Sequence, residues 1–429
     1  MDVVRGAALL GILLMNILSF GLPAAAYNNL TLWGGSDAPN LVVFAIQWVF
    51  FEGKMRALFS LMFGAGIAAF MSRAIVREDS ARVADIYCRR MLWLMALGAL
   101  HGWLIWHGDI LYAYGLWGLL LLPLRNARPR ALFIAGCVGL IAAQAFLTIT
   151  GLNHRSTRNA AVAARAAEAR GAVLTDDQEK AKREWDAVYN ATHPSKDTLQ
   201  KEIEDYRGGY GRALRRRAPI VRDMNSGPVY LPVAGDIWGM MLIGMGLFHL
   251  GVLQGKRSSR VYVRMVIVGY GIGIPMNALS TYGMISSDFE LIAIFLWNAP
   301  HELARAAVAV GHAALLILMT REGRLHWLTA RLAAVGQMAL SNYIATSVIC
   351  VLLFYVPGLG LMGQLQRFQL YYIVAGIWVF NIVWSQWWLG RFRFGPLEWA
   401  WRSLTYWQRQ PMLLHDLVRR ESGRPDQIT

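Results

Sequence analysis

A histidine and an aspartate stand in the short polar turn His107-Gly108-Asp109, which joins two apolar runs of the chain. A neutral imidazole near pH 7 is suited to general-base catalysis, and a neighbouring carboxylate can orient it. We therefore expect His107 to be a catalytic base that Asp109 orients. His101 lies nearly two helical turns earlier and is expected to line the same cavity. The alternative is that both histidines are interfacial residues without a chemical role.

Other polar side chains interrupt apolar runs at Asn16, Glu52, Lys54, Arg56 and Asp236. A polar group at membrane depth is expensive, so a functional role is its default interpretation. We expect Asn16 to have a site role and the other four to line a substrate cavity, with Glu52 paired to Lys54 or Arg56. A structural ion cluster and a hydrogen bond between helices are the competing interpretations.

Apolar helices must position these side chains, and the composition indicates such helices. Of the 429 residues, 56% are hydrophobic and 16% are charged, which is typical of a polytopic membrane protein. We predict an all-α transmembrane helix bundle of about ten spans. They are expected at 3–22, 55–72, 91–106, 109–124, 131–151, 230–254, 261–282, 302–320, 338–356 and 368–390. Two shorter apolar stretches, 40–51 and 290–299, are expected to be interfacial or re-entrant.

The net charge of +15 comes from arginine and lysine in alternate short loops. By the positive-inside rule these loops are cytoplasmic, which places both chain termini inside and His107 outside. Because the basic residues do not share one face, no nucleic-acid partner is expected. The three cysteines have no paired spacing, and a lone histidine and aspartate make a weak ligand set, so neither a disulfide framework nor a metal is expected.

The chain divides by composition into four parts. Residues 1–151 form an N-terminal transmembrane half of about five spans, and 229–390 form a C-terminal half of about five. Between them, 152–228 is a polar extracytoplasmic insertion, in which Thr175 and Gln178 predict a capping box at a helix start. Its arginines at 212 and 215–217 belong to a solvated helix pair or meet anionic lipid headgroups or an acidic substrate. Residues 391–429 are expected to form an amphipathic cytoplasmic tail.

Five stretches of the chain carry a specific combined pattern. They are 2–16 with Arg5-Gly6 and Asn16, 52–64 beginning Glu52-Gly53-Lys54, 107–115 beginning His107-Gly108-Asp109, 336–343 ending Ser341-Asn342-Tyr343, and 394–406 beginning Phe394-Gly395-Pro396. Together they resemble the YeiB family of bacterial membrane proteins, which contains the domain of unknown function 418. The resemblance covers nearly the whole chain and is weakest over 152–228.

The opening span of this family is similar to that of heparan-alpha-glucosaminide N-acetyltransferase, and both resemble a transmembrane acyltransferase superfamily. The resemblance implies transfer of an acyl group from cytoplasmic acyl-CoA, with acetyl-CoA the first choice of donor, to a small-molecule or glycan acceptor on the other membrane face. Asn16 matches the active-site asparagine by position. The relative's histidine after that span has no counterpart in 22–39, so His107 is expected to supply the base.

The acyltransferase interpretation further assigns the phosphates of CoA to Arg391, Arg393 and Arg402. It implies a multi-pass protein of the bacterial inner (plasma) membrane that contacts membrane lipid. A homodimer is compatible with this interpretation. The alternative is a proton-coupled transporter or a lipid-handling protein without catalysis, in which Glu52, Asp236 and Glu302 line a pathway.

Overall fold

The computed structural model describes residues 1–74, 79–225, 230–323 and 325–413, and this part of the chain is all-α. The first helices are α1 (Asp2–Gly21), α2 (Ala38–Phe50), α3 (Lys54–Ala74), α4 (Ser80–Leu104), α5 (Leu111–Leu119) and α6 (Pro129–Glu168). They are followed by α7 (Asp176–Thr192), α8 (Lys196–Arg207) and α9 (Tyr210–Asn225). The last are α10 (Tyr230–His249), α11 (Ser259–Ser286), α12 (Leu291–Trp297), α13 (His301–Glu322), α14 (His326–Gln337), α15 (Ala339–Phe354), α16 (Arg367–Leu389) and α17 (Pro396–Tyr406).

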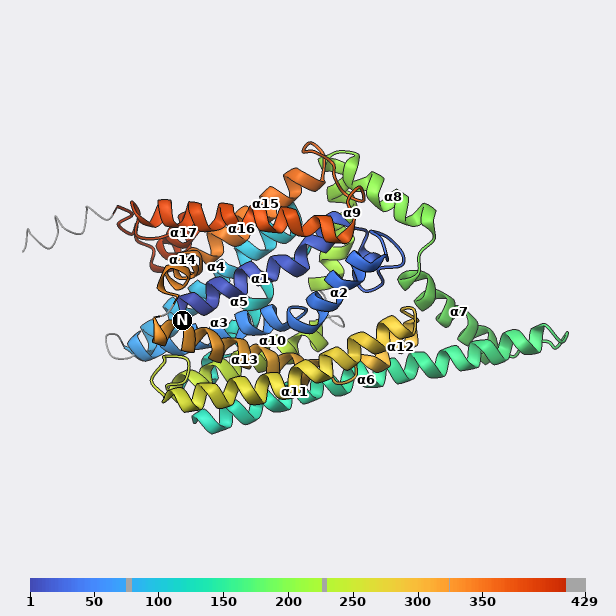
Figure 1. Ribbon diagram of the computed structural model, residues 1–429, viewed down its shortest axis with the longest axis horizontal. Coiled ribbons are helices and arrows are strands. Elements are labelled where there is room, and N and C mark those ends of the chain that lie inside the picture. Colours follow the sequence, from blue (N-terminus) through green and yellow to red (C-terminus); the bar gives the residue numbers. More distant parts are fainter. Residues whose placement is uncertain (75–78, 226–229, 324, 414–429) are drawn as a thin grey trace, which may run out of the picture.

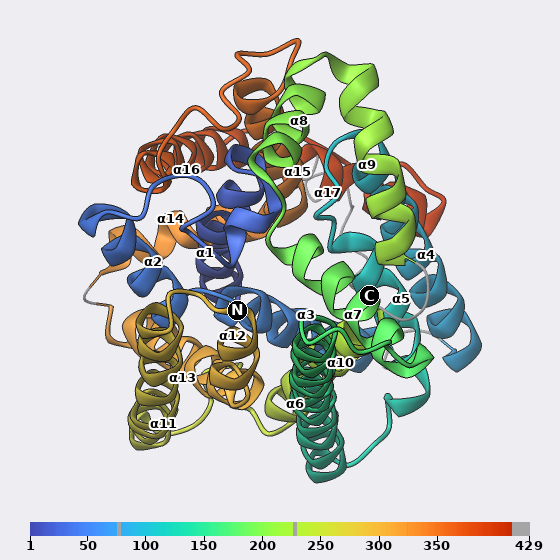
Figure 2. The ribbon, with the colours of Figure 1, turned by 90° about the vertical axis from the view of Figure 1, so that its right-hand side faces the viewer.

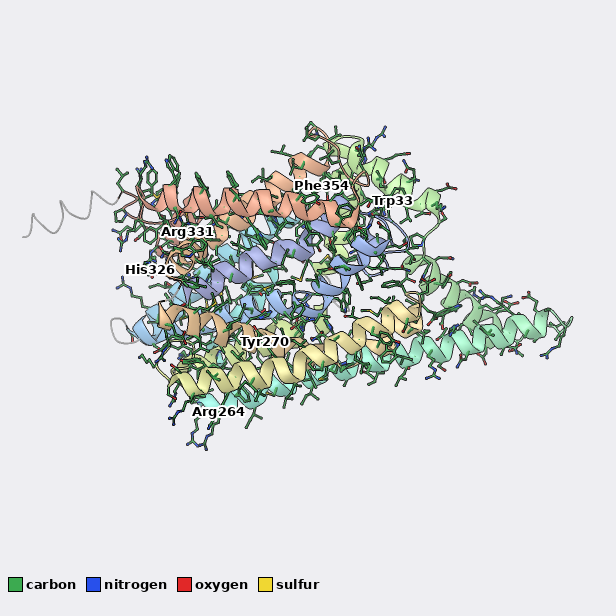
Figure 3. The ribbon with its side chains drawn as sticks, viewed as in Figure 1. Trp33, Arg264, Tyr270, His326, Arg331 and Phe354 are labelled. Atoms are coloured by element: carbon green, nitrogen blue, oxygen red, sulfur yellow. The ribbon has the colours of Figure 1, made fainter. Side chains whose placement is uncertain are left out.

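Long helices run side by side along the longest axis of the molecule and give it two different ends (Figure 1). The end with the N-terminus, α14 and α17 is called the basic end here, and Arg264, His326 and Arg331 lie there (Figure 3). The opposite end, where Trp33 and Phe354 lie, carries α7, α8 and α9 and is called the insertion end. Seen from the insertion end, α9 lies beside α4, and the two helices are in contact (Figure 2).

Helix α1 is the centre of the bundle. Of its most apolar stretch, 78% is buried inside the protein, against 22% for α11, whose outward face matches a lipid-exposed helix. α1 packs against α3, α14, α15 and α16. Two side chains of α16 donate to its main chain, the Trp378 indole to the Leu10 carbonyl at 2.9 Å and the Tyr371 hydroxyl to the Leu14 carbonyl at 3.0 Å.

Among the described residues, six helices or joined helices are long and apolar enough to cross a membrane, and the bent pair of α14 and α15 makes up to seven. The helix lengths therefore support six or seven spans in the described part of the chain and do not confirm the expected ten. The run at 109–124 folds as the nine-residue α5 and a 3-10 turn, and at about 1.5 Å per residue such a helix is too short to cross. The stretch at 40–51 is not separate, because α2 and α3 form one candidate span broken near Gly53, whose φ of 69° is left-handed.

The polar segment between the two sets of long helices folds as predicted around Thr175. The Thr175 hydroxyl accepts from the Gln178 amide, the Gln178 side chain accepts from the Thr175 amide, and α7 begins at the next residue. α6 continues far beyond its apolar part, and α7 returns along it (Figure 1). Residues 226–228 of the predicted insertion and 414–429 of the predicted tail lie outside the described ranges.

Helices α3 and α10 approach each other at two glycines. A Cβ built on Gly64 would lie 2.0 Å from the Met241 carbonyl oxygen, and one on Gly244 would lie 2.0 Å from the Leu61 carbonyl oxygen. Small residues allow such close contact between membrane helices, where packing rather than water drives association.

We expect Gly64→Ala to lower the free energy of unfolding by about 1–3 kcal/mol, because the added methyl group collides with a backbone that cannot move aside. Thermal unfolding in detergent measures the effect. Gly376→Ala on α16 is the matched control, since nothing lies within 4 Å of a Cβ built there. Equal melting temperatures for the two variants would contradict the close contact.

Candidate active site

Asp109 holds the imidazole of His101. The Asp109 Oδ1 lies 2.8 Å from the His101 Nδ1, and its Oδ2 accepts from the Tyr112 amide at 2.8 Å. Both side chains are buried, with exposed fractions of 1% for His101 and 6% for Asp109. The second carboxylate bond caps the first turn of α5, so the carboxylate is fixed from both sides.

The other nitrogen of His101 is available for chemistry. When Nδ1 carries the proton that it shares with Asp109, Nε2 is a proton acceptor, and this buried Nε2 has no hydrogen-bond partner among the described residues. The ring of Tyr343 lies 5.0 Å from the His101 ring. The Tyr343 hydroxyl accepts from the Ile110 amide at 3.4 Å and donates to the Gly108 carbonyl at 3.3 Å, which ties α15 to the turn.

The structure corrects the expected partner of Asp109, which is His101 and not His107. Chain reversal between α4 and α5 brings Asp109 back over the last turn of α4, whereas His107 points elsewhere and leaves its buried Nδ1 without a partner. Burial lowers the pKa of His107 to about 4, and the positive charge of Arg217 lowers it further in the same direction. His107 is therefore neutral near pH 7 but is not oriented by a carboxylate.

A cavity of about 320 Å³ leads from the basic end toward this pair. Its outer lining includes Arg5 of α1, Arg90 of α4 and Arg402 of α17, and its inner lining includes Ile110 and Tyr343. Phe59 and Phe63 of α3 form part of its mostly apolar wall. Along α3 the lining extends from Phe59 to Phe70, which is about 16 Å at 1.5 Å per residue. His101, which was expected to line the cavity, is not part of this lining, and its imidazole lies behind the ring of Tyr343, which is.

Cationic groups surround the outer part of the cavity. Among the described residues neither Arg90 nor Arg402 has a carboxylate within 4.0 Å, and Arg5 pairs with Asp2 at 3.0 Å. The buried Nε of Arg402 has no hydrogen-bond partner. Glu398 also lines the cavity, but its carboxylate accepts from the Leu340 amide at 2.7 Å and from the Ser341 hydroxyl and amide, and so caps α15.

Of the three arginines expected to hold an anionic donor, only Arg402 lines this cavity. The guanidinium of Arg391 lies over the Trp387 ring at 4.6 Å and that of Arg393 over the Phe394 ring at 5.0 Å, both outside the lining. The other two arginines that line the cavity are Arg5 and Arg90. Arg90 was not expected at the site, although its position directly before the apolar run at 91–106 is visible in the sequence.

Two of the charges expected in a cavity, Arg56 and Asp236, belong to an ion-pair network, in which the side chain of Arg56 is 34% exposed. Asp236 of α10 pairs with Arg56 of α3 at 2.8 Å and with Arg305 of α13, and Arg305 also pairs with Glu302. The side chains of Asp236 and Arg305 are 4% and 2% exposed. Arg305 was missed in the sequence, where its spacing of three residues from Glu302 on a helix could have indicated an ion pair.

Glu52 and Lys54 have neutral partners instead of each other. The Glu52 carboxylate accepts from the Tyr27 hydroxyl at 2.6 Å and from the Gln47 amide at 3.0 Å. The buried Lys54 ammonium donates to the Trp48 carbonyl at 2.6 Å and to the Asn277 side chain at 2.7 Å. The expected pairing of Glu52 with Lys54 or Arg56 is therefore wrong.

Asn16 lies on α1, beyond Ile12, which lines the cavity. Its side chain is half-buried, and it makes no hydrogen bond within the part of the chain that the structure describes. Its amide is thus free to bind a ligand or water, and no contact joins it to His101.

The long apolar helices with buried polar groups between them define an all-α membrane protein. Residues 247–408 match a family described as protein of unknown function (DUF418). The chain is 34% identical to the uncharacterized protein YeiB of Escherichia coli (strain K12), over 94% of this chain and 95% of the relative. It is 29% identical to the uncharacterized protein YxaH of Bacillus subtilis (strain 168), over 96% and 95%. The chain belongs to the YeiB/DUF418 family, and no solved structure matches it significantly.

Titration of His107 should be visible in stability. Its pKa of about 4 in the folded protein lies below the ordinary value of 6.5, so the unfolded chain binds more protons between these two values. Stability is therefore complete above pH 6.5 and falls toward pH 4, by at most about 3 kcal/mol. We expect melting temperatures in detergent between pH 7.5 and 4.5 to fall less for His107→Asn than for the wild type. The same pH dependence in both proteins would contradict the burial of this imidazole.

Proposed function

We propose that this protein is an integral membrane acyltransferase that moves an acyl group from acyl-CoA to an acceptor on the opposite membrane face. The observation that carries the proposal is the cavity that leads from Arg5, Arg90 and Arg402 to Tyr343, against which the His101–Asp109 pair lies. In this proposal the donor enters the cavity from the basic end, and the acceptor approaches the His101–Asp109 pair from the insertion end.

The outer cavity suits the phosphates of CoA. Guanidinium groups bind phosphate through paired N–H donors, and the buried unpaired Nε of Arg402 is such a donor. The mostly apolar cavity extends about 16 Å along α3 from the arginine end inward, which suits a slender thioester arm better than a bulky headgroup. Because the whole cavity has a volume of only about 320 Å³, we propose a short acyl group such as acetyl and not a long acyl chain.

The base in this proposal is His101, and Asp109 orients it. The Nε2 of His101 accepts the proton of an acceptor hydroxyl or amine while the acceptor atom bonds to the acyl carbon. The carbon–sulfur bond of the thioester then breaks, and the departing thiolate takes that proton. His107 becomes a neighbour of the site. Asn16 is retained as a candidate for the acyl oxygen, because its amide is free.

The proposed orientation places the basic end in the cytoplasm, where acyl-CoA is found, and the insertion end outside. Arginine and lysine in the short loops support this orientation. Both termini are then cytoplasmic, the membrane is the bacterial inner membrane, and the acceptor is a small molecule or glycan.

We expect His101→Gln to reduce acyl transfer by about 10²–10⁴-fold, because glutamine cannot take the proton. Purified protein in detergent is given acetyl-CoA with a panel of hydroxyl and amine acceptors, and release of the free thiol is measured. His107→Gln is the matched control and should stay within about tenfold of the wild type. The assignment of His101 is overturned if the two variants lose activity equally or if only His107→Gln does.

A proton-coupled transporter is the second candidate, and the ion-pair network of Arg56, Asp236, Arg305 and Glu302 favours it. In that case vesicles containing the protein should show proton flux without CoA, and Asp236→Asn should abolish it. Asp85→Asn, which alters an exposed pair with Arg89, is the control. Proton flux is measured with a pH-sensitive dye inside the vesicles. If the protein is an acyltransferase, this flux should not exceed that of empty vesicles.

A further inference from the structure

An arginine of the polar segment closes the end of the helix that carries His101. Arg217 of α9 is 1% exposed, and its guanidinium donates to three consecutive carbonyls. The Nε reaches Trp103 at 3.2 Å, Nη2 reaches Leu104 at 3.0 Å and Nη1 reaches Ile105 at 2.6 Å. The Tyr210 hydroxyl, also on α9, donates to the Leu104 carbonyl at 2.7 Å.

These contacts provide hydrogen-bond donors for the carbonyls at the C-terminal end of α4. The last carbonyls of a helix have no partner within it and carry the negative end of the helix dipole, so a cation there is stabilising. α4 ends at Leu104, and the His101 carbonyl accepts from the Ile105 and Trp106 amides at 2.8 and 2.9 Å. Without Arg217 the Trp103 and Ile105 carbonyls lose their side-chain donor, whereas the Leu104 carbonyl keeps the Tyr210 hydroxyl.

An aromatic contact with α1 also holds this turn. Trp106, which is 2% exposed, stacks on Phe20 of α1 with ring centroids 4.2 Å apart. Arg217 and Phe20 therefore clamp the residues that join His101 to Asp109. We expect loss of either contact to alter the position of the carboxylate relative to the imidazole.

Arg217 differs from the other arginines of its helix. Arg216 lies 3.5 Å from the Glu202 carboxylate, and the exposed Arg222 pairs with Asp223 at 3.4 Å. In the described ranges no carboxylate lies within 4.0 Å of Arg217, so main-chain carbonyls are its partners. Arg217 is therefore not placed to contact a lipid headgroup or a substrate. Its guanidinium instead stabilises the C-terminal end of α4.

We propose that Arg217 is a positioning residue of the active site, and that the polar segment holds the His101–Asp109 pair in catalytic geometry through it. The inference rests on the proposed acyl transfer for its kinetic consequence, whereas the clamp on α4 is independent of it. Removal of the guanidinium lets the last turn of α4 open, so that His101 and Asp109 separate while the cavity for the donor is unchanged.

The experiment compares Arg217→Met and Arg217→Lys with Arg222→Met, a matched loss of an exposed arginine on the same helix. Hydrogen exchange followed by mass spectrometry reports the opening of residues 99–107, and kinetics with acetyl-CoA report kcat and KM. We expect Arg217→Met to exchange at least tenfold faster there and nowhere on α3 or α10, with kcat at least tenfold lower and the donor KM within twofold. Arg217→Lys should recover part of both effects.

The outcomes separate the two claims. Unchanged exchange in 99–107 overturns the clamp, and so does exchange that rises equally throughout the bundle in Arg217→Met and also in Arg217→Lys. A normal kcat with fast local exchange overturns the positioning role. If the wild type transfers no acyl group to any acceptor, the proposed function fails, and local exchange in the variants still decides whether Arg217 holds α4.

Discussion

Ionic and polar groups inside an apolar bundle must satisfy one another, because hydrocarbon offers them no partners. Asp236 meets this constraint with two guanidinium groups, those of Arg56 and Arg305, and thereby joins α10 to α3 and α13. The contact between α3 and α10 is closed further at Gly64 and Gly244. α3 is thus fixed along much of its length, and its other face supplies the aromatic wall of the cavity.

The same constraint explains how the two ends of the molecule act on one site. At the basic end, arginines from α1, α4 and α17 converge on a cavity that continues inward as an apolar passage. At the insertion end, the terminal carbonyls of α4 need donors, and α9 provides Arg217. His101 lies between these regions, with Asp109 on one nitrogen and the other nitrogen free. The polar segment therefore contributes to the site instead of only covering it.

Much of the helical architecture could be predicted from apolar runs, and the capping box at Thr175 could be predicted from two residues. The number of spans could not be predicted. α5 is apolar but too short to cross the membrane, and α2 and α3, which meet near Gly53, together form one candidate span. Asp109 was expected to bond a histidine, but the partner is His101 and not His107, because the chain reverses between α4 and α5 and sequence spacing does not encode that reversal. The grouping of Arg5 and Arg90 with Arg402 likewise arises from packing of three helices.

Acyl transfer by this protein requires that the cavity bind the acyl-CoA donor. Binding of acetyl-CoA to the purified protein, measured by titration calorimetry, tests this with two variants of α4. Leu94 lines the cavity, and Leu92 faces outward with 53% of its surface exposed. We expect saturable binding of acetyl-CoA to the wild type and to Leu92→Trp. Binding to Leu94→Trp should be at least tenfold weaker, because the indole fills the cavity. Equal affinity of the two variants, or no binding to the wild type, would contradict this role of the cavity.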